Sequence, residues 1–141
     1  MKFINPTGYS IRNDDGGLGH HGAPRGNRKH DGIDLICKPN QDILMPVDGI
    51  VVRTSLPYKN DPQWQGVYIY NQRIEIKMWY LYPKISLYHK FLKAGTVIGK
   101  AQDISQKYEG VTPHIHLRIC RVDPCLLFNI NADTDDYEIV I

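Results

Sequence analysis

Hydrophobic and polar positions alternate with a period of two through the middle of the chain. In residues 73–81, RIEIKMWYL, the apolar side chains of Ile74, Ile76 and Met78 are separated by polar or amphipathic ones. Successive side chains of a strand point to opposite faces, so this pattern predicts a strand with one buried face. The Asn71-Gln72 pair just before it is expected to form a tight hairpin turn.

Similar short runs, rich in β-branched and aromatic residues and bounded by turn residues, predict further strands. They cover residues 32–37 (GIDLIC), 43–55 (ILMPVDGIVVRTS, with a Pro-Val-Asp-Gly turn), 66–71 (GVYIYN), 114–120 (HIHLRIC) and 137–141 (YEIVI). No stretch has a long helical period, and only residues 103–110 are expected to contain a helical turn. The pattern therefore predicts an all-β fold of antiparallel sheets folded over each other.

Length and composition fit one domain. The 141 residues suffice for a single core. Residues 1–29 are polar and rich in glycine, which predicts either a disordered arm or a functional loop beside a site. Residues 30–125 are expected to form the core of the domain, and residues 126–141 a C-terminal extension.

Charge and hydropathy argue against two kinds of partner. Lys and Arg number 17 against 15 Asp and Glu, a net charge of +2, which disfavours nucleic acid held by bulk charge. No apolar run is long enough to cross a bilayer. The first ten residues do not resemble a secretory signal, so we expect a cytosolic chain, export by another route to the periplasm or outside, or a signal beyond this sequence. Three cysteines do not predict a disulfide framework.

Candidate metal ligands come from two distant segments. His30 and Asp34 lie four apart, and a turn at Asp31-Gly32 would bring them together if Gly32 supplies the backbone freedom. His114 and His116 would share one face of a strand, with Ile115 turned to the core. Two imidazoles, a carboxylate and a water make an open zinc site of the catalytic kind. The histidine of the second pair that does not bind metal would then act as a base or an oxyanion donor.

The segments HDGIDL, PVDGIVV, LKAGTVIGK and HIHL together resemble the lysostaphin/LytM-type zinc endopeptidases over residues 17–120. The resemblance implies a lysostaphin-type, barrel-sandwich-like fold and hydrolysis of peptide cross-links in bacterial peptidoglycan. It implies one Zn²⁺ per chain, held by His30, Asp34 and His116, with His114 as the catalytic histidine.

A second catalytic histidine of that family falls at Tyr80 here. The segments GLGHHGAPRGNRKHDGIDLIC, IKMWYL and PHIHLRIC resemble more closely the leukocyte cell-derived chemotaxin type, which implies zinc binding without demonstrable peptidase activity. A phenol can donate a hydrogen bond to an oxyanion. Its pKa of about 10 prevents it from acting as a cation near neutral pH. Tyr80 is therefore expected to assist rather than replace the missing histidine.

Three further residues are candidates for substrate binding. Arg25 fits an arginine that recurs in the LytM-type loop, where it would pin the loop or bind a substrate carboxylate. His20 and His21, in the glycine-rich segment, are expected to rim the cleft.

Two functions remain open from the sequence. The first hypothesis is a zinc endopeptidase that acts on peptidoglycan peptides. The alternative is a catalytically inactive zinc-binding recognition or signalling module. A biotinyl- or lipoyl-carrier domain is rejected, because its modified lysine would stand at a hairpin tip whereas Lys77 lies inside a predicted strand.

Overall fold

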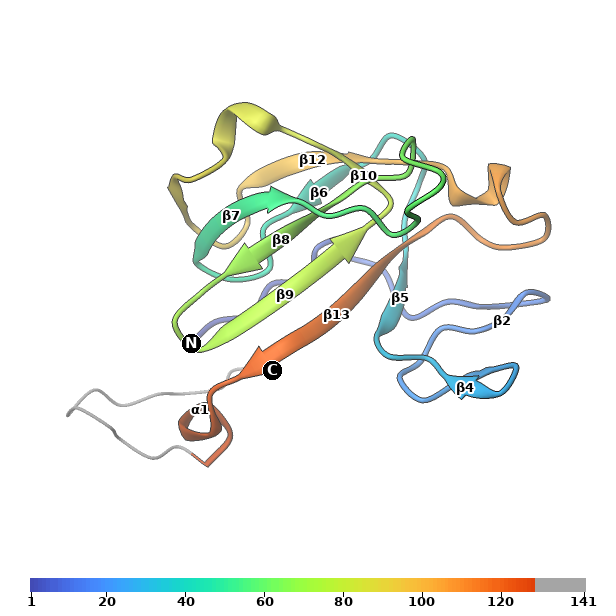
Figure 1. Cartoon of the computed structure of the whole chain (residues 1–141), viewed down its shortest axis with the longest axis horizontal. Helices are drawn as coiled ribbons and strands as arrows, with labels where there is room; N and C mark the ends of the chain where they lie inside the picture. The colour runs from blue at the N-terminus through green and yellow to red at the C-terminus, as the bar shows by residue number, and fades with distance from the viewer. Residues whose placement is uncertain (129–141) are drawn as a thin grey trace.

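Six strands form the main antiparallel sheet, in the order β11-β7-β8-β9-β13-β5 (Figure 1). The computed structural model describes residues 1–128. The strands of this sheet are β5 (Ile33–Ile36), β7 (Gly49–Thr54), β8 (Gly66–Tyr70), β9 (Ile74–Trp79), β11 (Phe91–Leu92) and β13 (His114–Val122). The short strand β5 pairs with the beginning of β13, and its other side forms a single bridge between Leu35 and Ile11.

A smaller sheet has the order β10-β12-β6. Its strands are β6 (Asp42–Leu44), β10 (Leu81–Pro83) and β12 (Val97–Ala101). One hydrophobic cluster joins it to the main sheet, because Ile43 and Ile98 of the small sheet belong to the same buried cluster as Ile69 and Ile115 of the large one. The prediction of an all-β fold is confirmed.

The period-two pattern has the predicted consequence in β9. Ile74, Ile76 and Met78 are buried, and the residues between them are partly exposed. The backbone N–H of Asn71 donates to the carbonyl of Ile74 over 2.9 Å and closes the predicted hairpin between β8 and β9. The core face of this sheet is therefore set by the alternation seen in the sequence.

The glycine-rich N-terminal region folds into two small hairpins rather than an open arm. They consist of β1 (Asn13–Asp14), β2 (Gly17–Leu18), β3 (Pro24–Arg25) and β4 (Arg28–Lys29). The segment also lies against β5, since the N–H of Arg12 donates to the carbonyl of Asp34 and the N–H of Asp34 to the carbonyl of Gly19, both over 2.8 Å. Of the two forms predicted, the structure has an ordered loop beside a site.

Helical segments within residues 1–128 are few and short. They are η1 (Ile85–Leu87), η2 (Ile104–Gln106) and α1 (Pro124–Phe128), and η2 is the helical turn predicted within residues 103–110. None of the helices in residues 1–128 is long and apolar enough to cross a membrane. The strand predicted at residues 137–141 and most of the C-terminal extension lie outside the described residues.

Candidate metal centre

Pairing between β5 and β13 places Asp34 directly opposite His116 in the sheet. The chain bends at Gly32, just before β5, so His30 comes back over the same face as Asp34. His114 and His116 are both buried on one face of β13, and Ile115 between them belongs to the core. The two distant segments of the sequence therefore meet at the edge of the main sheet.

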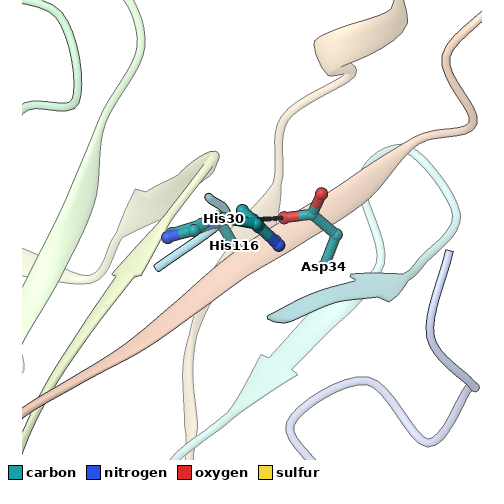
Figure 2. Close-up of side chains that lie close together, drawn as sticks. All are labelled: His30, Asp34 and His116. Atoms are coloured by element: carbon teal, nitrogen blue, oxygen red, sulfur yellow. Dashed lines mark hydrogen bonds and ion pairs between the residues drawn. The ribbon is translucent and has the colours of Figure 1, made fainter. Parts of the chain in front are cut away.

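Three potential ligand atoms form a small triangle at this meeting point. His30 Nε2 lies 3.0 Å from His116 Nδ1 and 3.1 Å from Asp34 Oδ1, and the last two atoms are 3.0 Å apart. Figure 2 shows the carboxylate of Asp34 pointing toward the two imidazoles. Zinc bonds of about 2.0–2.1 Å in a tetrahedral site put neighbouring ligand atoms about 3.3 Å apart. The triangle is thus close to the size that zinc requires, and it leaves the fourth position for another ligand.

The hydrogen bonds around the two imidazoles suit this role. His30 Nδ1 donates to the carbonyl of His20 over 3.0 Å, which leaves the lone pair of Nε2 directed at the triangle. His116 Nε2 is buried and makes no hydrogen bond within residues 1–128, and the carboxylate of Asp31 lies 3.4 Å from it. Without a metal, His116 Nδ1–H can donate to Asp34 Oδ1, which lies 3.0 Å away. With the proton on Nε2 instead, facing Asp31, Nδ1 carries a second lone pair, so two lone pairs and a carboxylate oxygen converge where a cation could be held.

Two arginines, as well as the histidines, stabilise the negative charge of Asp34. Its Oδ2 atom accepts from Nε and Nη2 of Arg12, each over 3.2 Å, and Arg25 Nη2 lies 3.4 Å away. Burial alone would raise the pKa of Asp34, but the hydrogen bond from His116 and the nearby histidines bring it down to about 2. The carboxylate is therefore ionised at neutral pH, as a metal ligand must be.

Gly32 has a different role from the one expected. Its backbone does not lie in the left-handed region, so freedom of angle is not what selects glycine here. A Cβ atom at this position would lie 2.9 Å from both Cε1 and Nε2 of His116 and would also meet the carbonyl oxygen of Leu117. The expectation about Gly32 is corrected: glycine is needed because both the Leu117 carbonyl of β13 and the His116 ring lie close to its backbone.

The two residues proposed for catalysis lie beside the triangle. His114 Nδ1 donates to the carbonyl of Thr112 over 2.8 Å, and its Nε2 lies 3.7 Å from Asp34 Oδ2. Burial lowers the pKa of His114, which favours a neutral ring with a free lone pair on Nε2. The ring of Tyr80 meets that of His114 edge-on, with 5.5 Å between the centroids. Both side chains line the same cleft as the triangle.

The three candidate substrate-binding residues behave differently from one another. Arg25 lines the cleft, but its guanidinium donates to the carbonyls of Leu18 and Pro24 and reaches Asp34, so it pins the loop. The side chains of His20 and His21 are exposed and do not line this cleft. His20 contributes instead through its backbone carbonyl, which orients His30.

Sequence reasoning missed several residues that shape the site. Arg12 is buried between Asp34 and Asp14, and nothing in its surrounding sequence, SIRNDD, marks it as a partner of a distant aspartate. Trp79 stacks on the ring of His116 with 5.1 Å between centroids. Its place on β9 opposite His116 follows only from the pairing of β9 with β13.

The chain is similar in sequence to several known animal proteins. No family model matches it. It is 32% identical over 112 residues to leukocyte cell-derived chemotaxin-2 of Bos taurus, a match that covers 78% of this chain and 73% of the relative. The chemotaxin-2 of Mus musculus is 27% identical over 108 residues, or 76% of this chain and 70% of the relative. Myeloid protein 1 of Gallus gallus is 30% identical over 125 residues, 85% of this chain and 38% of that protein.

These relatives support one of the two resemblances seen in the sequence. None of the three bears the name of a peptidase, so the comparisons lend no support to the lysostaphin/LytM-type assignment. The chemotaxin resemblance is confirmed by the extent and identity of the first match. The chain belongs to the leukocyte cell-derived chemotaxin-2 family.

Proposed function

We propose that this protein is a zinc-binding recognition or signalling module of the chemotaxin type, without peptidase activity. His30, Asp34 and His116 hold one zinc ion, and the adjoining cleft binds a group of a partner molecule. The single observation that carries the proposal is the triangle of ligand atoms, whose three sides measure 3.0–3.1 Å. Membership of the chemotaxin-2 family supports the choice of a module over an enzyme.

The donor set favours zinc over the harder divalent cations. Two imidazole nitrogens and one carboxylate oxygen suit zinc, whereas calcium and magnesium take shells of oxygen atoms. Burial lowers the pKa of His30, and the carbonyl of His20 and the charge of Asp34 only partly offset it. A neutral His30 is what a metal requires, because a protonated imidazole has no lone pair to give.

Tyr80 argues against peptide hydrolysis by this site. Burial raises the pKa of Tyr80 to about 12, so the phenol stays neutral and supplies one hydrogen bond instead of a positive charge. Zinc, when bound, would polarise a carbonyl oxygen at its open position. The chain itself adds only the Tyr80 hydroxyl and the His114 lone pair to that chemistry.

Peptide hydrolysis is the second candidate function, and His114 favours it. Its Nε2 atom lies 3.7 Å from Asp34 Oδ2 and is free to take a proton from an attacking water. An endopeptidase acting on peptidoglycan would use His114 as its base and Tyr80 as an oxyanion donor.

Metal content and hydrolysis, measured on the same preparation, distinguish these functions. Zinc per chain is determined by elemental analysis after reconstitution and dialysis, for the wild type, His116→Ala and His21→Ala. The last variant removes an exposed histidine outside the cleft. The same samples are then assayed for release of amino groups from peptidoglycan and from pentaglycine, with His114→Ala as the control.

We expect about one zinc per chain in the wild type and in His21→Ala, very little in His116→Ala, and no hydrolysis. Cleavage that is lost in His114→Ala would establish the peptidase instead. Failure of the wild type to bind zinc would refute both functions.

A further inference from the structure

The cleft next to the metal triangle extends far beyond it, with a volume of about 830 Å³. The residues that line it include Arg12, Arg25 and Arg28 from the N-terminal region and Tyr58, Lys107 and Tyr108 from later segments. A volume of this size accommodates several residues of a peptide or a small organic ligand. These lining residues are therefore expected to determine which ligand the proposed module binds.

Three tyrosines form a hydrogen-bonded chain that ends at Tyr80, beside His114 in the cleft that contains the metal triangle. The hydroxyl of Tyr108 donates to that of Tyr58 over 2.8 Å, and the hydroxyls of Tyr58 and Tyr80 are also 2.8 Å apart. Each phenol has one proton; Tyr58 accepts from Tyr108 and can therefore donate its own proton to Tyr80, although either hydroxyl of that pair can be the donor. With Tyr58 as the donor, the proton of Tyr80 has no acceptor within residues 1–128, and Tyr80 lines the cleft. The chain of hydroxyls thus presents a hydrogen-bond donor to whatever occupies the cleft.

The backbone of Tyr80 has an unusual conformation. Its φ angle is 78°, in the left-handed region that a bulky residue rarely occupies. The N–H of Tyr80 donates to the carbonyl of Gln65 over 2.7 Å, and its carbonyl accepts from the N–H of Gln102 over 2.8 Å. Strained conformations that their surroundings enforce are concentrated at functional sites. The Tyr80 hydroxyl is therefore fixed in place before any ligand arrives.

The charge of the cleft favours an anionic ligand. The side chains that line it include four cationic ones (Arg12, Arg25, Arg28, Lys107) and three anionic ones (Asp31, Asp34, Glu109), a formal balance of +1 that becomes +3 with Zn²⁺ bound. Arg12 and Arg25 already form ion pairs with Asp34, and Lys107 forms one with Asp61. The exposed guanidinium of Arg28 makes no ion pair or hydrogen bond with any described residue, so it is available to a ligand.

We propose that this cleft binds a carboxylate group of a peptide, which accepts a hydrogen bond from the Tyr80 hydroxyl while Arg28 supplies a second positive contact. The inference rests on the proposed function, because bound zinc provides most of the positive charge. A carboxylate matches both features of the site, since it offers several lone pairs to a donor and pairs well with a guanidinium. A neutral amide can accept from Tyr80 but has no charge for Arg28 or the metal.

Three short peptides that differ in charge test the idea with the zinc-loaded full chain. They are acetyl-Gly-Gly-Gly with a free C-terminus, acetyl-Gly-Gly-Gly-amide, and acetyl-Gly-Glu-Gly-amide. Calorimetric titration gives the affinity of each. The first and third peptides distinguish a terminal carboxylate from an acidic side chain. The variants are Tyr80→Phe, Arg28→Gln and, as a matched control, Lys29→Gln, whose exposed side chain neighbours Arg28 but does not line the cleft.

We expect at least one of the two carboxylate peptides to bind tenfold or more tightly than the neutral amide. Tyr80→Phe is expected to weaken carboxylate binding about tenfold, the usual worth of a hydrogen bond to a charged group. Arg28→Gln is expected to weaken it severalfold, whereas Lys29→Gln leaves it unchanged. Zinc content and circular dichroism are measured for every variant, so a folding defect is recognised.

Two results would overturn this inference while the proposed function stands. One is full zinc content with equal or undetectable binding of all three peptides, a comparison that needs no variant. The other is carboxylate binding that Tyr80→Phe leaves unchanged, which would mean that the metal alone selects the ligand. Absence of zinc from the wild type is a separate failure, that of the proposed function, and the inference falls with it.

Discussion

Replacing Gly32 with alanine tests whether the structure of the metal centre depends on close packing against the backbone. The added Cβ would lie 2.9 Å from two atoms of the His116 ring and would also meet the carbonyl oxygen of Leu117. Carbon atoms in comfortable contact are about 3.5–4.0 Å apart. Relief therefore requires the ring, or the strand that carries it, to move by roughly 0.5 Å or more.

The size of the effect follows from two separate costs. Forcing an extra methyl group into a well-packed site typically destabilises a protein by about 1–3 kcal/mol. A metal site also tolerates errors of only about 0.2 Å in its bond lengths, and His116 belongs to the triangle. We expect Gly32→Ala to lower the unfolding free energy of the zinc-free protein by about 1–3 kcal/mol and to weaken zinc binding at least tenfold.

Urea unfolding of the zinc-free protein and competition with a chelator of known affinity measure the two effects separately. Ile98→Val is the control, because Ile98 is buried in β12 of the small sheet, whereas Asp34 and His116 lie on strands of the main sheet. That change costs about 0.5–1.5 kcal/mol of stability and is expected to leave zinc affinity intact. If Gly32→Ala binds zinc as tightly as the wild type, the packing of His116 on this backbone is not what sets the ligand geometry.

Three other predictions concern the surroundings of the site. Saturating zinc, at about 100 times its Kd, should add about 2.7 kcal/mol of stability and raise Tm by roughly 5–10 °C; calorimetry on His116→Ala should show no shift, and a full shift there would place the zinc elsewhere. Gln102→Leu removes two hydrogen bonds from the buried amide, to the N–H of Gln65 and the carbonyl of Gln63, and should cost about 2–3 kcal/mol in urea unfolding; a neutral outcome would mean that this amide does not support the Tyr80 backbone. Asp14→Asn should cost about 1–3 kcal/mol at pH 7. Burial would raise the pKa of Asp14, but the Thr112 N–H and Arg12 outweigh it and lower that pKa. The stabilisation by Asp14 is therefore present above about pH 4 and lost as the pH falls below that value. A difference in unfolding free energy between wild type and variant that persists at pH 2 would contradict this pH dependence.

The sequence predicted the parts of the fold that follow from local pattern. Alternation in residues 73–81 and the β-branched runs around it correctly indicated strands in the main sheet, because burial of one sheet face imposes a period of two. β12 was not predicted, since Gly99 interrupts its apolar run. The structure explains this glycine: a Cβ there would lie 2.7 Å from Leu81 Cδ1, so the small sheet needs close approach at that point.

The candidate ligands could be predicted from the sequence because histidine and aspartate residues a few positions apart are common metal ligands. Arg12 and the chain of Tyr58 and Tyr108 were not accessible, since each acts on a residue more than twenty positions away. Their roles arise from loops that pack against the end of the main sheet. Such contacts depend on tertiary structure, and no local spacing encodes them.

The candidate metal centre and the core depend on the same strand register. His114 and His116 face the cleft only because Ile115 faces the core, and His116 lies opposite Asp34 in the pairing of β13 with β5. A slip of one residue would bury both imidazoles in the hydrophobic cluster and turn Ile115 toward the carboxylate. Both misplacements carry a large penalty, because buried polar groups without partners are costly. The packing that stabilises the sheet therefore also selects the register that places His116 opposite Asp34, two of the three proposed ligands, and the site needs no flexible loop to bring these two together.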